Sequence, residues 1–369
     1  MKILFICGSI ESGKDGVGDY TRRLAGELIR QVHECAIVAI MDKGVEESRE
    51  EQQDSEQTNI PVLRLPYSNG YRLNCKEAKD WIDAFNPDWI SLQYVPFSFH
   101  PRGLPFGLGD SIQLLVKGRK LHVMFHELWV GMNTEASFKL VQWGRVQRAM
   151  IRSFIKNVNP LAINTHTKLY HLQLNKIGVS ASLLPLFSNI AVVSSNTIFK
   201  DPDLLRFVVF GTIHPEAPIE SFASSARKYA IDNNLDIEIL CIGRCGSELQ
   251  RWIDICKSKK IMIRVLGEQP SAKISEVLNS ASWGLTTTPL LTSEKSGTVA
   301  AMLEHGLPVL CISKPWRVKD FPIDYTPFGV QSFKEGDLTP FLNTKNENII
   351  INTVSYISNQ FLVSLLKFK

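Results

Sequence analysis

The regular alternation of short apolar segments with amphipathic segments constrains the fold of this chain more than any other feature. The first apolar segment, Lys2–Cys7, is followed at residues 19–30 by the period of an amphipathic helix. Strands that are apolar along their whole length are buried on both faces, as in a parallel sheet covered by helices on each side. The alternation therefore predicts an α/β fold of doubly wound parallel sheets. Further strands are expected at residues 35–40, 89–94, 121–125, 161–164, 206–210, 237–242, 261–266, 283–287 and 309–312.

These expected strands form two series, which predicts two domains. A chain of 369 residues also exceeds the size at which a single hydrophobic core stops growing. We expect one Rossmann-like domain over residues 1–190 and another over residues 204–345, facing a cleft, with a linker at residues 201–203. The charged, glutamine-rich run 42–59 interrupts the first series, and we expect a mobile loop or a solvated helix there.

Composition restricts the class of protein. Hydrophobic residues make up 44% of the chain and charged residues 21%, as in ordinary globular proteins, and no apolar run reaches the length of about 18 residues that a membrane span needs. The start of the chain resembles a buried strand rather than a signal peptide. Seven cysteines without paired spacing favour a reducing cytoplasm, and Cys241 and Cys245 lack the second pair expected of a zinc site. A net charge of +4 is compatible with anionic substrates or a membrane surface and does not indicate nucleic-acid binding.

One turn in the second series has the features of an anion site. Residues 294–298 (EKSGT) form a polar turn that runs directly into an apolar helix ending near Gly306 and Pro308. Ser296 or Thr298 can cap this helix, so that free N–H groups and the positive end of the helix dipole face outward, which favours a phosphate. The alternative is a capped surface helix with a glycine stop.

The order of segments around this turn carries a family resemblance. A strand near 264–267, a helix at 271–281 and a strand from Trp283 deliver the turn to the end of a parallel strand, where ligands bind in open α/β sheets. The run RVLGEQPSAKISEVLNSASWGLTTTPLLTSEKSGTVAAMLEHGLPVL resembles the donor-binding half of GT-B glycosyltransferases, in particular the retaining family 4. The resemblance covers nearly the whole chain, and it implies that a final helix at 349–369 crosses back onto the first domain. The alternative is a pair of Rossmann-like domains with another purpose.

The resemblance implies a donor site in the second domain for a nucleoside-diphosphate sugar. The base would lie near residues 266–268, the diphosphate at residues 296–298, and the sugar hydroxyls near Glu294. The residues expected in this site are Leu266, Gly267, Glu268, Glu294, Lys295, Ser296, Gly297 and Thr298, together with Gly211, Thr212 and Arg244 at two strand ends.

Three departures from the family pattern concern this same donor site. The family carries a second glutamate, which holds the ribose, but counting forward from Glu294 leads to Met302, and counting back from Gly306 leads to Ala301. Thr212 stands where the family has an arginine, and no lysine follows it in the expected region. Arg244 at the next strand end, or Lys295 in the turn, is the expected replacement for the missing positive charge.

In the first domain, a glycine-bearing segment follows the first strand. The run 8–15 (GSIESGKD) resembles a nucleotide-binding P-loop, but Asp15 stands where a magnesium-binding Ser or Thr is required, so P-loop function is not expected. The segment also lacks the third glycine of a dinucleotide motif. The following run, Asp15–Tyr20 (DGVGDY), resembles the family's glycine-rich loop, which contacts the acceptor or the diphosphate, with Gly16, Val17, Gly18 and Tyr20 as the expected residues. The alternative is a flexible β–α turn.

His126 follows the strand that begins at Leu121, at the end where ligands bind. The resemblance implies that His126 lies beside the transferred sugar and contacts the sugar or the leaving phosphate. A structural histidine is the alternative. A metal site with His122 is not expected, because two side chains four positions apart on a strand lie about 13 Å from each other.

A basic helix in the first domain offers a further surface. Arg145, Arg148, Arg152 and Lys156 fall on one helical face beside apolar residues. A helix with such a face can lie on an anionic membrane. The alternative is a helix that packs on the domain and exposes its basic face to solvent.

Taken with the resemblance, these features predict a glycosyltransferase that moves a sugar from a UDP-, GDP- or ADP-linked donor to an acceptor hydroxyl with retention. The alternatives are a GT-B nucleotide-sugar epimerase, or a degenerate GT-B protein that binds a sugar nucleotide or a partner enzyme without turnover. No obligatory metal or cofactor is expected. The expected location is the cytoplasm, and the protein is also expected to be able to contact the inner face of a membrane peripherally. Sugar, base, acceptor and oligomeric state are not specified by the sequence.

Overall fold

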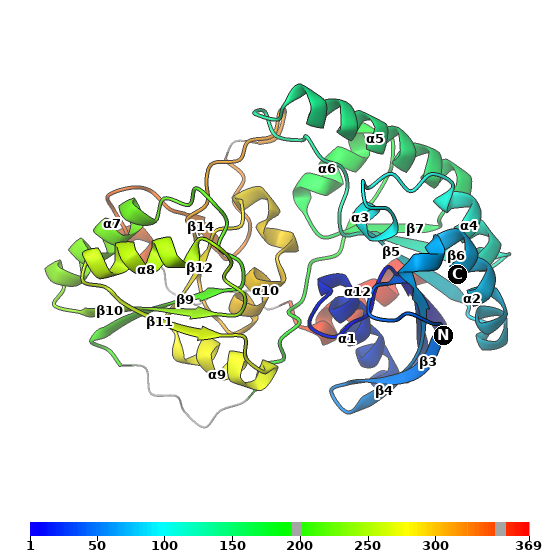
Figure 1. The fold of residues 1–369 in the computed structure, drawn as a ribbon, viewed down its shortest axis with the longest axis horizontal. Coiled ribbons are helices and arrows are strands. Elements are labelled where there is room, and N and C mark those ends of the chain that lie inside the picture. Colours follow the sequence, from blue (N-terminus) through cyan, green and yellow to red (C-terminus); the bar gives the residue numbers. More distant parts are fainter. Residues whose placement is uncertain (194–200, 323, 344–351, 369) are drawn as a thin grey trace. The chain divides into compact units, whose positions relative to one another are not determined.

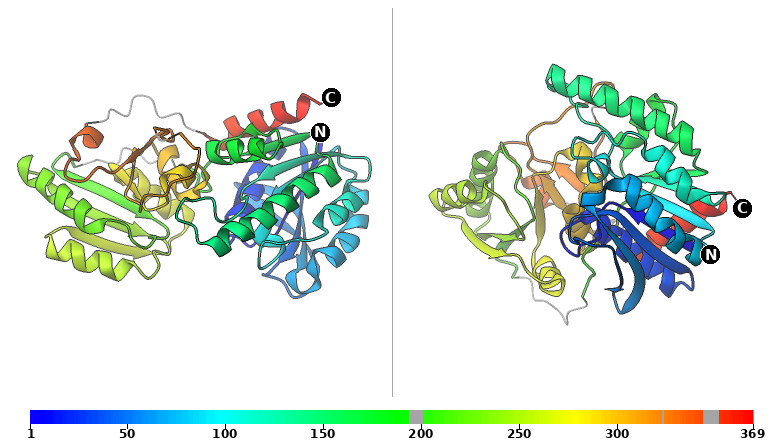
Figure 2. Two further views of the ribbon diagram at one scale, coloured as in Figure 1. Left: turned by 90° about the horizontal axis from the view of Figure 1, so that it is seen from above. Right: turned by 45° about the vertical axis from the view of Figure 1, so that its right-hand side comes forward.

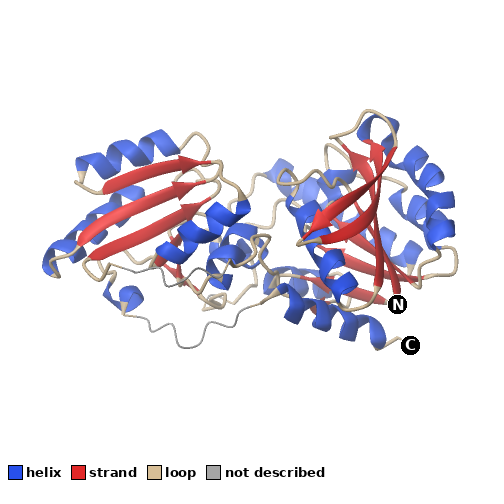
Figure 3. Cartoon of the chain, turned by 90° about the horizontal axis from the view of Figure 1, so that it is seen from below, coloured by secondary structure: helices blue, strands red, loops and turns tan. Residues whose placement is uncertain are grey.

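The computed structural model describes residues 1–193, 201–322, 324–343 and 352–368, which fold into two compact units. The first unit comprises Met1–Pro185 and Val354–Lys369, and the second comprises Leu186–Thr353. Each unit is a sheet with helices on both faces (Figures 1 and 3). The predicted α/β class with two Rossmann-like domains is confirmed.

The first unit contains, among its described residues, an eight-stranded sheet in the order β3-β4-β2-β1-β5-β6-β7-β8. All pairings in it are parallel except that of β3 with β4. The chain adds strands on one side of β1 as far as β4 and then crosses to β5 on the other side. The strands are β1 Lys2–Cys7, β2 Glu34–Asp42, β3 Arg49–Ser55, β4 Thr58–Pro66, β5 Trp89–Tyr94, β6 Lys120–Phe125, β7 Ala162–Thr165 and β8 Ser182–Leu183.

The expectation of a loop or helix across 42–59 is wrong, because β3 and β4 form an antiparallel hairpin there. Ser55 pairs with Thr58, and the two turn residues, Glu56 and Gln57, both have positive φ, at 52° and 65°. A two-residue turn of this handedness matches the twist of the flanking strands. The strand β3 lies at the sheet edge, and its charged side chains disfavour pairing with other chains. Because the strand has few apolar residues, its hydrophobic pattern does not reveal it as a strand.

Helices cover both faces of this sheet, and α12 packs beside α1 (Figure 2). The Gln31 amide donates to the Ser358 hydroxyl at 2.8 Å. The rings of Phe5 and Phe361 stack with their centroids 5.9 Å apart. In the range predicted for the last helix, residues 349–351 and 369 lie outside the described residues. The helices are α1 Gly16–Arg30, the 3₁₀ turn η1 Tyr67–Asn69, α2 Gly70–Phe85, α3 Pro96–Phe99, α4 Leu108–Val116, α5 Phe138–Val158, α6 Lys168–Lys176 and α12 Val354–Leu366.

The helix α1 starts earlier than predicted. Its first residue is Gly16, because the carboxylate of Asp15 caps it by accepting from the Gly18 N–H at 2.7 Å. Residues 16–18 are therefore the first turn of a helix and not a loop. The lack of a side chain at Gly18 is required, since a Cβ there would lie 2.6 Å from the Ser9 carbonyl oxygen.

The second unit contains, within the residues described, a six-stranded parallel sheet in the order β11-β10-β9-β12-β13-β14. Its switch point, where the strand order reverses, lies between β9 and β12. Its elements are β9 Leu204–Phe210, α7 Ile219–Asp232, β10 Asp236–Ile242, α8 Leu249–Ser258, β11 Met262–Gly267, α9 Ser271–Ser280, β12 Trp283–Thr286, the 3₁₀ helix η2 Leu290–Lys295, α10 Gly297–Glu304, β13 Val309–Cys311, β14 Val330–Ser332 and α11 Thr339–Leu342.

A pair of glycine substitutions tests the packing of the α1 start. We expect Gly18→Ala to destabilise the protein by about 1–3 kcal/mol, because the added methyl group overlaps the backbone of Ser9 and Ile10. Gly16→Ala is the matched control, since a Cβ at Gly16 meets nothing within 4 Å. Urea unfolding midpoints measure both effects, and equal midpoints for the two variants would contradict this account.

Candidate functional site

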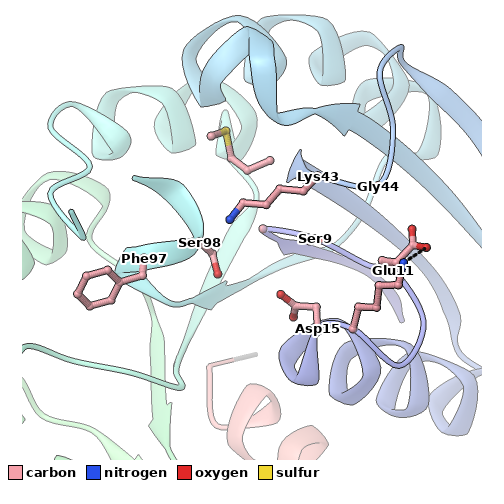
Figure 4. A pocket seen from close by; sticks show the side chains of 10 residues that line it. Ser9, Glu11, Asp15, Lys43, Gly44, Phe97 and Ser98 are labelled. Atoms are coloured by element: carbon pink, nitrogen blue, oxygen red, sulfur yellow. Dashed lines mark ion pairs between the residues drawn. The ribbon is translucent and has the colours of Figure 1, made fainter. Parts of the chain in front are cut away.

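The first unit has a pocket of about 430 Å³ at the switch point of its sheet, where β1 lies between β2 and β5. Ligands of open α/β sheets bind at this place, outside the carboxyl ends of the strands. Three strand ends supply the walls. The lining residues are Gly8, Ser9, Glu11, Lys14, Asp15, Met41, Lys43, Gly44, Phe97 and Ser98 (Figure 4).

The buried carboxylate of Asp42 holds two of these walls together. Its oxygens accept from the Ser9 hydroxyl at 3.0 Å and from the Gly44 N–H at 2.8 Å. Arg64 of β4 compensates its charge at 2.8 Å. Burial by itself would raise the pKa of Asp42, but the Arg64 contact and the hydrogen bonds lower it below its ordinary value.

Of the predicted glycine-rich run Asp15–Tyr20, Asp15 is the residue that lines this pocket. Gly16, Val17 and Gly18 form the first turn of α1 and are not among the lining residues. Tyr20, also predicted in this group, is buried and places its ring edge-on to His126, with the centroids 5.0 Å apart. The sequence does not identify Lys43 and Ser98 as site residues. They follow different strands, β2 and β5, and the strand order of the sheet brings them to the same pocket.

His126 belongs to a buried chain of polar side chains across β5, β6 and β7. Its Nε2 faces Gln93 Oε1 at 2.8 Å and its Nδ1 faces His166 Nε2 at 2.9 Å. His166 Nδ1 in turn faces the Leu184 carbonyl at 2.9 Å. Both ring nitrogens thus have partners inside the first unit, so a substrate contact by His126 requires one of these partners to be replaced.

The chain continues from Gln93 through Ser91 to His122. The Gln93 amide donates to the Ser91 hydroxyl at 2.8 Å, and that hydroxyl lies 2.8 Å from His122 Nδ1. His122 Nε2 faces Asn164 Oδ1 at 3.0 Å, and the Asn164 amide donates to the Ser182 carbonyl at 3.2 Å. Because Asn164 Oδ1 only accepts, His122 carries its proton on Nε2. Burial lowers the pKa of His122 to about 4, so this histidine is neutral near pH 7.

In the second unit, glycines build the carboxyl edge of the sheet. Gly211, Gly243 and Gly267 follow or end the adjacent strands β9, β10 and β11, with φ values of 83°, 88° and 66°. The Gly211 N–H donates to the Ile242 carbonyl at 2.8 Å, and the Gly243 N–H donates to the Gly267 carbonyl at 2.7 Å. The three strand ends therefore turn together at a rim without side chains.

The start of α10 lies at the switch point of this sheet. A Cβ on Gly211 would come within 2.9 Å of the Thr298 methyl group, so the end of β9 directly adjoins the first turn of α10. Ser296 caps the helix by accepting from the Val299 N–H at 3.4 Å, which confirms one of the two predicted caps. Ser296 and Thr298 hydroxyls are 3.1 Å apart.

Glu294 and Lys295 belong to η2 rather than to an open turn. The Tyr325 hydroxyl donates to Glu294 Oε1 at 2.5 Å, and Tyr325 was not predicted as a site residue. Burial, with the adjacent carboxylate, raises the pKa of Tyr325. The tyrosine stays protonated and fixes the direction of the glutamate.

The predicted phosphate cation, Arg244, is engaged by another predicted site residue. Its Nε donates to Glu268 at 2.9 Å, and the two side chains are 62% and 68% exposed. A pair this exposed contributes about 0–1 kcal/mol, so an anionic ligand can displace Glu268 at low cost. Of the other predicted donor-site residues, Thr212 is exposed. Leu266 is partly buried and packs against the hydrophobic core of the second unit.

Neither position tested for the second glutamate is accessible. Met302 and Ala301 are fully buried on the core side of α10. Glu304 is also buried, and its carboxylate accepts from the Ser188 N–H at 3.0 Å. It ties the start of the second unit to α10.

In the described part of the chain, no group of three or more His, Cys, Asp or Glu side chains is placed to hold a metal ion. No helix in these residues has the length and apolarity to cross a membrane.

Neither family models nor curated protein sequences match this chain. Solved structures do match over its full length. HepE from Anabaena, in complex with UDP and glucose, is 14% identical with a TM-score of 0.56, and the match covers 100% of each chain. The lipopolysaccharide outer core galactosyltransferase WaaB is 12% identical with a TM-score of 0.55, covering 100% of this chain and 99% of the other.

An epimerase has the same fold. The UDP-GlcNAc 2-epimerase from Neisseria meningitidis, bound to UDP-GlcNAc, is 11% identical with a TM-score of 0.53 and full coverage of both chains. The comparisons establish the GT-B fold for this chain.

The buried position of His122 predicts a pH-dependent stability. With a pKa near 4 in the folded protein and about 6.5 unfolded, the unfolded chain binds the additional proton between these values, so stability falls as pH is lowered through this window. At pH 5 the loss is on the order of 2 kcal/mol relative to pH 7.5. His122→Gln removes this titration and places there an amide, which can still donate and accept hydrogen bonds.

The measurement is the free energy of unfolding of both proteins from pH 7.5 to pH 5. We expect His122→Gln to be the less stable protein at pH 7.5 and the difference to shrink toward pH 5. A difference that stays constant over this range would show that His122 does not titrate as described.

Proposed function

We propose that this chain is a GT-B glycosyltransferase that moves a sugar from a nucleoside-diphosphate sugar to an acceptor hydroxyl with retention, as in family 4. The observation that carries the proposal is the capped start of α10 at the switch point of the second sheet, beside the glycine rim. Backbone N–H groups at a helix start favour an anion, and the rim leaves room for a diphosphate. The UDP complex of HepE, which has the same fold, supports UDP as the nucleotide.

In this proposal the protein acts mainly by electrostatic stabilisation of the leaving diphosphate. Gly297 and Thr298 supply N–H groups, and Arg244 or Lys295 supplies positive charge. Glu294, held by Tyr325, accepts from sugar hydroxyls. No obligatory metal is part of the proposal.

A nucleotide-sugar epimerase is the second candidate, because the fold is shared. The pocket at the switch point of the first sheet favours the transferase, since an epimerase acts on one substrate whereas a transferase must also bind an acceptor. A protein that binds a sugar nucleotide without turnover fits the buried Met302 and the pairing of Arg244 with Glu268. Release of the sugar from UDP-, GDP- and ADP-sugars, with and without acceptors, separates these functions.

We also propose that α5 contacts an anionic membrane surface. The helix has no Asp or Glu, and Arg145, Arg152 and Lys156 are exposed, with Phe138 79% exposed at its start. Arg148, predicted on the same face, instead lies over the Trp129 ring at 5.8 Å. An exposed aromatic side chain beside basic residues suits the headgroup region.

Blocking the start of α10 tests the donor site. Gly297→Val should abolish the rise in melting temperature that UDP produces, together with turnover, because the side chain covers the helix N–H groups. The fold accommodates it, since a Cβ at Gly297 meets only the Asn189 amide at 3.9 Å. Thr339→Val, at the first residue of α11, is the control. An unchanged UDP shift in Gly297→Val would place the nucleotide elsewhere.

Vesicle binding tests the role of α5. We expect the protein to co-sediment with phosphatidylglycerol vesicles and not with phosphatidylcholine vesicles. Arg152→Ala should weaken this binding by about 1 kcal/mol and Phe138→Ser should weaken it further, while Lys76→Ala on α2 has no effect. Equal binding to both kinds of vesicle, or no binding to either, would reject the proposal.

A further inference from the structure

The acidic side chains that line the pocket of the first unit already have partners. Glu11 pairs with Arg64 at 2.6 Å and lies 3.7 Å from Lys14. Asp15 is the cap of α1 and so faces the positive end of that helix. The charge of Glu11 is therefore compensated within the protein, whereas burial and the nearby carboxylates of Asp19 and Asp42 raise the pKa of Asp15.

The positive charge of Lys43 has no such compensation. Lys43 follows Asp42 at the end of β2 and is exposed, and its Nζ lies over the Tyr67 ring at 5.1 Å. Across the residues that the structure describes, no carboxylate lies within ion-pair distance of this Nζ. The side chain extends over the pocket toward Ser98 (Figure 4).

A hydroxyl donor lies on the wall that Lys43 faces. Ser98 belongs to α3, directly after β5, and its main chain is held by the Val95 carbonyl at 3.0 Å. Its backbone packs against β1 so closely that a Cβ on Gly8 would lie 2.5 Å from Ser98 Cβ. This contact fixes the position of the Ser98 Cβ at the wall, from which the hydroxyl can reach the pocket.

The pocket of about 430 Å³ is small for a ligand site, and the fixed walls suit a sugar-sized molecule. A neutral sugar would leave the Lys43 ammonium facing the Tyr67 ring and water, without an anionic partner. An anionic group on the sugar would accept charge-assisted hydrogen bonds from the ammonium and a further one from Ser98. Since Lys43 is exposed, this pairing needs no burial of an unpaired charge.

We propose that this pocket binds an acceptor of sugar size that carries an anionic group, a phosphate or a carboxylate, held by Lys43 and Ser98. The proposal rests on the proposed function, because the pocket is the acceptor site of that reaction. Lys43 is thus a specificity-determining residue that selects acidic acceptors over neutral ones.

Calorimetric binding of three probes to the full chain tests this specificity: glucose 1-phosphate, glucuronate and glucose. We expect the wild-type protein to bind at least one of the two anions about tenfold or more tightly than glucose, with the preferred anion identifying the group. Raising the salt concentration should weaken anion binding. Glucose binding as tight as that of both anions would overturn the proposal.

The variants isolate the lysine. Lys43→Met should lose about tenfold or more in affinity for the preferred anion, whereas Lys43→Arg keeps it within a few-fold and Lys76→Met on α2 behaves as wild type. Wild-type affinity in Lys43→Met would overturn the assignment. Because Lys43 is exposed, its variants should keep the wild-type melting temperature, which separates loss of the site from loss of folding.

Binding requires neither a donor nor turnover, so the two proposals can fail separately. Anion binding that depends on Lys43, without sugar transfer to any acceptor, would reject the proposed function and retain the anion site. Transfer to neutral acceptors with an acceptor KM unchanged in Lys43→Met would retain the function and reject the anionic acceptor.

Discussion

The buried carboxylate of Asp42 is the interaction on which the site of the first domain depends. One side chain bonds to the segment after β1, to the segment after β2, and to Arg64 of β4. A buried ion pair contributes little net stability, but removing one partner leaves an uncompensated charge and is strongly destabilising. The main effect of the Asp42–Arg64 pair is therefore to position the segments that it connects. It sets the distance between the two walls of the pocket, and Arg64 acts on the pocket without lining it.

Among the described residues of the second domain, the segments that follow the strands are positioned without a buried ion pair. Its strand ends turn at Gly211, Gly243 and Gly267, and backbone hydrogen bonds connect these turns. Absence of side chains allows the first turn of α10 to approach β9. An anion at this rim would therefore meet main-chain donors, whereas one in the first domain would meet side chains. The two halves share a strand order around β1 and β9 but recognise ligands by different means.

Features with a local cause could be predicted from the sequence. The apolar strands and the Ser296 cap follow from short-range rules, and the structure agrees with them. The sequence pattern places the start of α1 too late, because Gly16 and Gly18 favour a loop, whereas the cap at Asp15 decides where the helix begins. The hairpin of β3 was missed because a charged edge strand has no hydrophobic signal, and the turn residues Glu56 and Gln57 are not the usual ones for positive φ.

Contacts between distant segments could not be predicted in this way. Tyr325 reaches Glu294 across 31 positions, and Gln93 and His166 flank His126 from two other strands. Lys43 reaches its pocket only because β2 and β5 lie on opposite sides of β1. Each of these pairings depends on the order of strands in the sheet. That order follows from the whole fold, and no window of sequence contains it.

The burial of Met302 restricts which side chains this position accepts. Met302 is fully buried and belongs to the core of the second domain. A single change to glutamate would bury a carboxylate among apolar side chains, at a cost of several kcal/mol unless it is protonated. The helix would first have to rotate or its neighbours shrink. An acidic group that contacts a ligand of the second domain therefore has to come from a position outside this core.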